Sequence, residues 1–246
     1  MKLKIFIPVI VLAIILQACS SGAVSAGKQE LVTPTSAPTG TPVPENPTEK
    51  AYYDDFSGSD PGWSELLTVT TQAQPGQMKS SARVVDGLLT FDFQEKETYL
   101  YKFFANPSGA DVVIESKVQG AGQLENGMAL VCRAKNDQTA WYEARISGLN
   151  QYDIYRFDAA QRDAEKNPYI KLQHGALRGD IFKPTKQNVI RFTCQGSDLM
   201  LEVNDQTITT VQDGTLSEGG LAGVGAMSGT ILPLSVRFDY FSYGQP

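Results

Sequence analysis

The sequence has little of the chemistry on which zinc and nucleophilic catalysis depend. His174 is the only histidine, and there are three cysteines among 246 residues. A structural zinc site needs four ligands, usually Cys and His. A catalytic triad would have to use His174, yet no serine lies in a Gly-x-Ser-x-Gly turn. We therefore expect neither site, and we interpret His174 as a surface residue at the end of a strand.

Positive charge is also scarce. The chain has 21 Lys and Arg against 27 Asp and Glu, which gives a net charge of −6. An acidic chain is poorly suited to bind nucleic acid or anionic lipid directly, so we expect no nucleic-acid partner. The composition does not predict an oligomeric state.

The longest apolar run, residues 5–16, follows two lysines and is too short to span a bilayer, which takes about 20 residues. The next segment, Leu16-Gln17-Ala18-Cys19, resembles the bacterial lipobox, whose cysteine receives a diacylglyceryl thioether and an amide-linked acyl chain such as palmitate. The resemblance implies a bacterial lipoprotein with a signal peptide at residues 1–18 and lipid on Cys19. It places the mature chain outside the cytoplasm, anchored to the cell membrane or the outer membrane. The alternative is an ordinary secretory signal that happens to carry a cysteine.

Residues 19–50 are predicted to form a tether behind the lipidated cysteine. Residues 20–50 contain five prolines among Thr and Ser and no aromatic residue. Such a segment is a solvated, partly polyproline spacer, and at about 3.1 Å per residue it could extend roughly 90 Å. Residues 51–246 have ordinary globular composition and a length that suits one large domain.

The other two cysteines, Cys132 and Cys194, are predicted to form a disulfide. Both lie in apolar, strand-like segments, and an exported protein matures where disulfides persist. The alternative is a pair of buried free thiols, which would carry no chemistry unless exposed.

Apolar residues beyond residue 80 occur in short segments rich in β-branched and aromatic side chains. Such alternation predicts strands, and Asp86-Gly87 and Asn204-Asp205 lie where tight hairpin turns are expected. Residues 159–166 are charged on all sides, so a loop or single turn is expected there. We predict strands at 51–56, 83–85, 88–94, 98–104, 111–119, 127–134, 140–147, 151–157, 169–173, 187–195, 198–204, 206–212, 220–227 and 233–243. So many strands predict an all-β fold, a two-sheet antiparallel sandwich of jelly-roll type.

Several segments, in this order, resemble concanavalin A-like sandwich domains of the laminin G and 3-keto-disaccharide-hydrolase-like group. They are Tyr53-Asp54-Asp55-Phe56-Ser57 with Gly62-Trp63, then Asn126-Gly127-Met128-Ala129, Trp141-Tyr142-Glu143-Ala144-Arg145-Ile146, Gly220-Leu221-Ala222-Gly223-Val224-Gly225 and Arg237-Phe238-Asp239-Tyr240-Phe241. The resemblance implies that the first and last strands pair, with Asp55-Phe56 near Phe238-Asp239. It also implies a possible structural calcium ion, with Asp54, Asp55 and Asp239 as candidate ligands. No other cofactor is expected.

Glycoside hydrolysis needs two carboxylates about 5 to 9 Å apart. The laminarinase-type pattern Glu-x-Asp-x-x-Glu is absent from the sequence. Glu143 could act with a carboxylate of a neighbouring strand, such as Asp153. An ion pair between Glu143 and Arg145 is an equally plausible interpretation.

Strand alternation points instead to a ligand-binding face. If Tyr142 points into the core, then Trp141, Glu143 and Arg145 point outward, and Asp153 and Tyr155 of the next strand share that face. Arg133 is expected to point outward from the preceding strand. Aromatic rings stack on the apolar faces of sugars, and charged groups bond to hydroxyls. The alternative is that Trp141 and Tyr155 belong to the core and that the charges form a solvated face.

These observations together predict a membrane-anchored lipoprotein whose domain binds a glycan or another surface polymer without catalysis. One alternative is a saccharide-acting enzyme resembling glycoside hydrolases. Another is a structural or protein-interaction domain of the cell envelope.

Overall fold

The computed structural model describes residues 50–58, 62–74, 76–120 and 126–246. The chain divides into two units, Met1–Pro44 and Glu45–Pro246, and the described residues belong to the second. The predicted signal peptide, Cys19 and all of the tether except Lys50 lie outside them. Within the described ranges, no helix has the length and apolar content needed to cross a bilayer.

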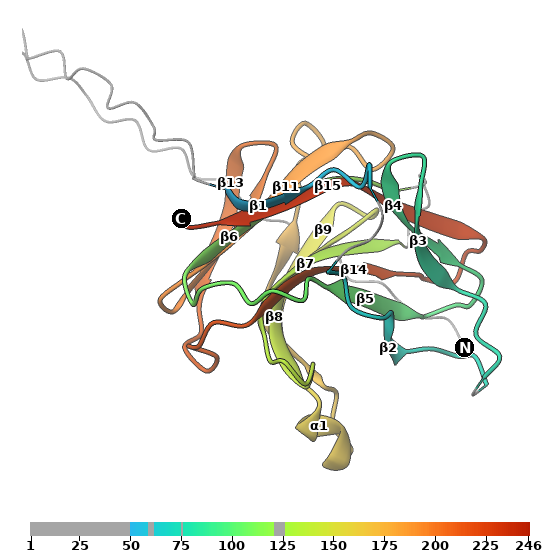
Figure 1. Ribbon diagram of the computed structural model, residues 1–246, viewed down its shortest axis with the longest axis horizontal. Coiled ribbons are helices and arrows are strands. Elements are labelled where there is room, and N and C mark those ends of the chain that lie inside the picture. The colour runs from blue at the N-terminus through green and yellow to red at the C-terminus, as the bar shows by residue number, and fades with distance from the viewer. Residues whose placement is uncertain (1–49, 59–61, 75, 121–125) are drawn as a thin grey trace, which may run out of the picture. The chain divides into compact units, whose positions relative to one another are not determined.

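Two antiparallel sheets form a sandwich, as predicted (Figure 1). The eight-stranded sheet has the order β13-β12-β11-β6-β15-β4-β3, with β1 also paired to β15, and the seven-stranded sheet has the order β10-β9-β8-β7-β14-β5-β2. The elements are β1 (Lys50–Asp54), β2 (Leu67–Thr70), β3 (Ser81–Val85), β4 (Leu88–Phe93), β5 (Tyr99–Phe103), β6 (Val112–Gly120), β7 (Gly127–Ala134), β8 (Ala140–Ser147), β9 (Gln151–Asp158), α1 (Ala160–Asp163), β10 (Tyr169–Ala176), β11 (Asn188–Gln195), β12 (Asp198–Val203), β13 (Gln206–Gln212), β14 (Leu221–Met227) and β15 (Leu234–Gly244). The single turn α1 lies where a loop or one turn was expected.

The main core lies between the two sheets and includes Phe91, Tyr142 and Phe238, all fully buried. Cys132 on β7 and Cys194 on β11 form a disulfide with their Cα atoms 6.7 Å apart, which confirms the predicted bridge. Because β7 and β11 belong to different sheets, the bridge joins the two layers covalently.

Tight turns connect β3 to β4 and β12 to β13, as the sequence predicts. Asp86 and Gly87 have φ angles of 51° and 72°, and Asn204 and Asp205 have 50° and 61°. Positive φ at both central residues gives a turn whose twist matches that of the paired strands. The Asn204 side chain also accepts a hydrogen bond from the Val189 amide at 2.8 Å, which fixes the second turn.

The first and last strands pair, as the resemblance implied. Asp54 lies opposite Phe241, and β1 ends there, so the predicted strand at 51–56 is too long. The chain turns because Phe56 has a φ of 54° and its amide donates to the Asp54 carboxylate at 2.8 Å. Asp55 and Phe56 therefore lie just beyond the paired residues of β1.

Strand β2 was not among the predicted strands. It has only four residues, and it pairs with β5 at the edge of the seven-stranded sheet. Its first three residues are half-buried, so Leu67-Thr68-Val69 shows no alternation of buried and exposed positions. Without that alternation the segment carries no clear strand signal.

Candidate functional site

Five of the six predicted ligand-binding residues lie on one face of the seven-stranded sheet, the face turned away from the main core. Trp141, Glu143 and Arg145 alternate along β8, and Asp153 and Tyr155 lie on β9. Glu143 is opposite Tyr155, and Arg145 is opposite Asp153. The predicted alternation is therefore confirmed on these two strands, and we call this surface the outer face.

The outer face is concave, because side chains from opposite edges of the sheet meet across it. We call it the concave face from here on. The hydroxyl oxygens of Tyr169 on β10 and Tyr101 on β5 are 3.0 Å apart. The rings of Tyr169 and Tyr99, also on β5, have centroids 5.5 Å apart. Since β9, β8, β7 and β14 separate β10 from β5 in the sheet, such contacts require strong curling.

A second apolar cluster forms the floor of this concave face. The rings of Trp141 and Phe157 stack with centroids 3.8 Å apart, and Tyr101 and Phe103 lie beside Trp141. Gly225 is needed below them, since a Cβ atom there would lie 2.5 Å from the Tyr101 ring. Trp141 has no solvent exposure, so the expectation that it presents an open stacking surface is wrong.

Glu143 is also fully buried, and its carboxylate accepts hydrogen bonds from neighbouring side chains of the same face. It accepts hydrogen bonds from the Trp141 indole at 2.9 Å and from the Tyr101 hydroxyl at 2.8 Å. Arg145 forms the ion pair with it that the sequence left open, with Nε donating at 3.0 Å. Burial would lower the pKa of Arg145, but the Glu143 charge raises it well above its usual value. Arg145 therefore stays charged beside the buried carboxylate.

Three tyrosine rings surround the Arg145 guanidinium. Its central carbon lies 4.8 Å from the ring centroid of Tyr99, 4.7 Å from that of Tyr155 and 4.9 Å from that of Tyr169. These distances fall within the range of cation–π attraction. The Arg145 side chain is 12% exposed, and the three tyrosines are half-buried, so this layer lies above the floor and reaches solvent.

Charged residues form the rim of the concave face beside Tyr155. The Asp153 carboxylate lies 2.9 Å from Lys171 Nζ and 2.9 Å from His174 Nδ1. Burial raises the pKa of the Tyr155 hydroxyl, which keeps it protonated as a donor. His174 is half-exposed on β10, in agreement with its predicted surface position.

Arg133 does not join this face. A bulge in β7 opposite β14 places Arg133 at a φ of 50°, and its side chain turns inward, 1% exposed. Its guanidinium donates to the carbonyl oxygens of Ala110 at 2.6 Å, Gly196 at 2.9 Å and Leu216 at 2.9 Å. The prediction that Arg133 points outward is wrong because the bulge breaks the alternation.

Three residues of the concave face, Tyr99, Tyr169 and Lys171, were not predicted from the sequence. Tyr99 alternates with Tyr101 and Phe103 along β5, so an aromatic stripe was visible in the sequence. Nothing in the sequence indicates that β5 faces β10 across the curled sheet, because that contact depends on the curvature.

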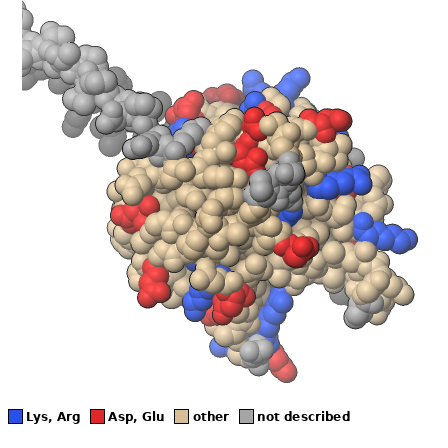
Figure 2. All heavy atoms as spheres, viewed as in Figure 1, with Lys and Arg blue, Asp and Glu red and all other residues tan. Residues whose placement is uncertain are grey.

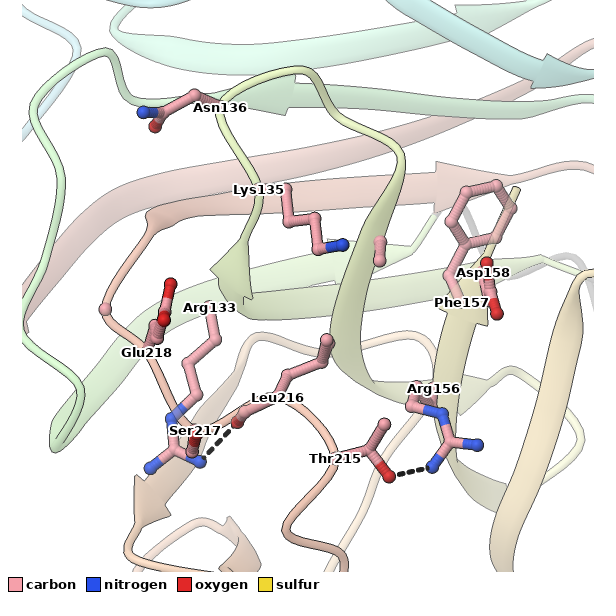
Figure 3. A pocket seen from close by; sticks show the side chains of 12 residues that line it. Arg133, Lys135, Asn136, Arg156, Phe157, Asp158, Thr215, Leu216, Ser217 and Glu218 are labelled. Carbon is pink, nitrogen blue, oxygen red and sulfur yellow. Dashed lines mark hydrogen bonds between the residues drawn. The ribbon is translucent and has the colours of Figure 1, made fainter. Parts of the chain in front are cut away.

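A pocket of about 540 Å³ lies at one end of the sandwich, between the β7–β8 turn and residues 213–219 (Figure 3). We call it the end pocket. Its lining includes Arg133, Lys135, Arg156, Asp158 and Glu218. No sequence motif indicated it, since separate loops supply its walls.

A hydrogen-bond network holds one wall of the end pocket. Asp213 accepts from the Tyr142 hydroxyl at 2.6 Å and pairs with Arg156, which also donates to Thr215 at 2.6 Å. Burial and the bond to Asp213 raise the pKa of Tyr142 to about 12. Burial alone would raise the pKa of Asp213, but the bonds from Tyr142 and Thr215 lower it. At neutral pH the Asp213 carboxylate is therefore ionised and the Tyr142 hydroxyl is protonated and donates to it.

The three candidate calcium ligands do not form a common site. Asp54 accepts a hydrogen bond from the Trp63 indole at 2.8 Å, Asp55 caps its own turn, and Asp239 pairs with Lys117. In the part of the chain that the structure describes, no three His, Cys, Asp or Glu side chains converge as metal ligands. These residues therefore do not fit a shared calcium ion.

Comparisons with known proteins agree with the architecture. No known family and no curated protein matches the sequence. Among solved structures, a carbohydrate binding module from Bacillus subtilis has a TM-score of 0.55 at 12% identity, covering 75% of this chain and 96% of that one. A β-glucanase from Bacillus licheniformis has a TM-score of 0.57 at 9% identity, covering 79% and 98%. The catalytic domain of a laminarinase from Thermotoga petrophila has 0.58 at 10% identity, covering 80% and 98%. The chain therefore has the concanavalin A-like jelly-roll fold that carbohydrate-binding modules and glucanases share.

Proposed function

We propose that this protein is a lipid-anchored extracytoplasmic domain that binds a glycan or another surface polymer without catalysis. The observation that carries the proposal is the upper layer of the concave face. There Tyr99, Tyr155 and Tyr169 reach solvent around Arg145, beside the charged rim at Asp153. The fold shared with carbohydrate-binding modules supports the proposal.

This layer combines the two kinds of contact that sugar recognition uses. Half-buried tyrosines offer both ring surface and a hydroxyl, and they lose little conformational freedom on binding. Lys171 and His174 add donors at the rim. Lys171 and Asp153 place both signs of charge at the rim, which suits a polymer of low charge better than a polyelectrolyte. Acidic and basic side chains of the described residues are also interspersed on the side of the molecule shown in Figure 2.

Catalysis has less support, although the fold also occurs in glucanases. A glycosidase needs a carboxylate that can exchange protons with the substrate and a second one nearby. Glu143 is buried and ion-paired to Arg145, and Asp153 is paired to Lys171. The enzyme alternative would require turnover that disappears in Glu143→Gln. Capture of a protein partner that no sugar competes away would instead support the interaction alternative.

Replacing Tyr155 with alanine is expected to weaken glycan binding about 10-fold, since one ring contact of roughly 1 to 1.5 kcal/mol is lost. The full chain in detergent would be tested on glycan arrays and in polysaccharide affinity gels. Val85→Ala, at an exposed position of β3, is the matched control. The proposed function would be abandoned if the wild-type chain bound no polysaccharide, and the concave face would be excluded as its site if Tyr155→Ala bound every ligand as tightly as the wild type.

Replacing Cys19 with alanine is expected to abolish acylation and release the protein from the membrane fraction. Lipid on Cys19 would add about 0.8 kcal/mol of membrane affinity per buried methylene, and more than one chain is needed for stable anchoring. Incorporation of labelled palmitate, followed by fractionation of a bacterial host, measures both effects. Cys132→Ala with Cys194→Ala is the control and should keep the label. Labelling that persists in Cys19→Ala would refute the anchor.

A further inference from the structure

We propose that the end pocket is a second binding site, and that it takes a neutral saccharide unit. This inference rests on the proposed glycan-binding function and goes beyond the concave face. The pocket lies outside the layer of tyrosines around Arg145, and its lining includes none of Tyr99, Tyr155 and Tyr169.

The end pocket has the volume of a small-molecule site, and hydrogen bonds and the disulfide hold its walls in place. About 540 Å³ lies within the usual range for small-molecule sites. The Arg133 guanidinium donates hydrogen bonds to three backbone carbonyls from separate segments of the chain, those of Ala110, Gly196 and Leu216. The interlayer disulfide involves Cys132, next to Arg133, and so fixes this floor. A site whose walls are fixed in advance loses less entropy on binding.

The opposite wall is held equally firmly. Arg156 bonds to Asp213 and Thr215, and Tyr142 accepts the Leu216 amide at 2.9 Å while it donates to Asp213. These contacts tie residues 213–216 to β8 and β9. Both arginines of the pocket therefore belong to its framework, Arg133 through three carbonyls and Arg156 through Nη1, and other side chains also face a ligand.

The groups left for a ligand carry both signs of charge. Within the described chain, the side chains of Lys135, Ser217 and Glu218 form no hydrogen bond or ion pair, and all three are exposed where they line the pocket. In Figure 3, Lys135 extends toward the side where Asp158 lies, and Glu218 lines the other side. Lys135 and Ser217 can donate, and Glu218 can accept. Asp158 already accepts from the Ala160 amide at 3.0 Å and from the Gln161 side chain at 3.3 Å, and its remaining lone pairs can accept from a ligand.

This mixture selects the chemical class of the ligand. The carboxylates of Asp158 and Glu218 would repel a polyanion, and Lys135 would repel a polycation. A neutral sugar carries hydroxyls that both donate and accept, so it can use every one of these groups. Leu216, which also lines the pocket, offers an apolar contact for the ring.

The test compares two pocket variants of the full chain in detergent, Lys135→Ala and Glu218→Gln, by isothermal titration calorimetry. The probes are neutral gluco-, manno-, galacto-, xylo- and fructo-oligosaccharides. Each variant is expected to lose about 10-fold or more in affinity for at least one of them, since each removes a hydrogen bond to a charged group. Lys186→Ala, an exposed lysine that does not line the pocket, is the control and should bind as the wild type does. Neither pocket side chain bonds within the described chain, so both variants should keep the wild-type melting temperature.

The outcomes separate this inference from the proposed function. If oligosaccharides bind and Tyr155→Ala weakens them while both pocket variants bind normally, the second site is refuted and the glycan-binding function stands. If the pocket variants lose affinity and Tyr155→Ala does not, the end pocket is the glycan site and the concave face is not. If the wild-type chain binds none of the five probes, the end pocket is not a site for neutral saccharides.

Discussion

Replacing Glu143 with alanine is expected to lower the free energy of unfolding by about 3 to 5 kcal/mol, because it leaves one charge of a buried ion pair without its partner. Glu143 has no solvent exposure and holds Trp141, Tyr101 and Arg145 together. The substitution leaves the Arg145 guanidinium among three tyrosine rings with no carboxylate beside it. It also leaves the indole and hydroxyl donors without their acceptor.

Urea unfolding followed by tryptophan fluorescence would measure this loss, with the exposed Glu218→Gln as the matched control. A double variant, Glu143→Met with Arg145→Met, should be markedly more stable than Glu143→Ala, since removing both charges avoids the unpaired one. Loss of less than about 1 kcal/mol in Glu143→Ala would show that water enters the concave face and solvates Arg145. In that case the face is more open than the structure indicates.

Removing the disulfide is expected to cost about 4 kcal/mol, which is the value the chain-entropy model gives for a loop of this length. Cys132 and Cys194 are separated by 62 residues in the sequence and lie in different sheets. The double variant Cys132→Ala with Cys194→Ala loses the one disulfide found between the two layers among the described residues. The loss should appear as a lower urea midpoint.

The control for this prediction is the reductant. Wild-type protein in dithiothreitol should unfold at nearly the same urea concentration as the double variant, and reductant should leave the variant unchanged. Cys19→Ala should match the wild type, because Cys19 takes no part in the bridge. Equal midpoints for oxidised and reduced wild-type protein would mean that packing alone holds the layers together. Weaker oligosaccharide binding in the double variant would further indicate that the bridge supports Arg133 and the end pocket.

Local sequence patterns predicted the strands and turns well. The segments around Trp141 and Asp153 alternate, and the structure gives them the expected strand boundaries at 140–147 and nearly so at 151–158. Asp86-Gly87 and Asn204-Asp205 were recognisable as turns because few residue types tolerate positive φ. Strand β2 was not predicted, because a four-residue edge strand has too few positions to show a period of two.

The candidate site was predicted in part. Alternation correctly placed Trp141, Glu143 and Arg145 on one face, because successive side chains of a strand point to opposite sides of the sheet. It failed to predict their exposure, and it failed at Arg133, where a bulge adds a residue to β7. The alternation of side chains along a strand predicts which residues share a face of the sheet. Whether those residues are buried depends on the elements that cover that face.

The all-β class and the hairpin turns followed from local geometry, and the whole case for lipid on Cys19 rests on a short motif. The Cys132–Cys194 bridge followed from the strand-like segments around both cysteines and from an exported compartment in which disulfides persist. Only the tertiary structure decided that Tyr169 crosses the curled sheet to reach Tyr99, that Glu143 is sealed beneath Arg145, and that separate loops enclose the end pocket. The reason is physical: curvature and loop packing bring together residues far apart in the chain, and no local period records those contacts.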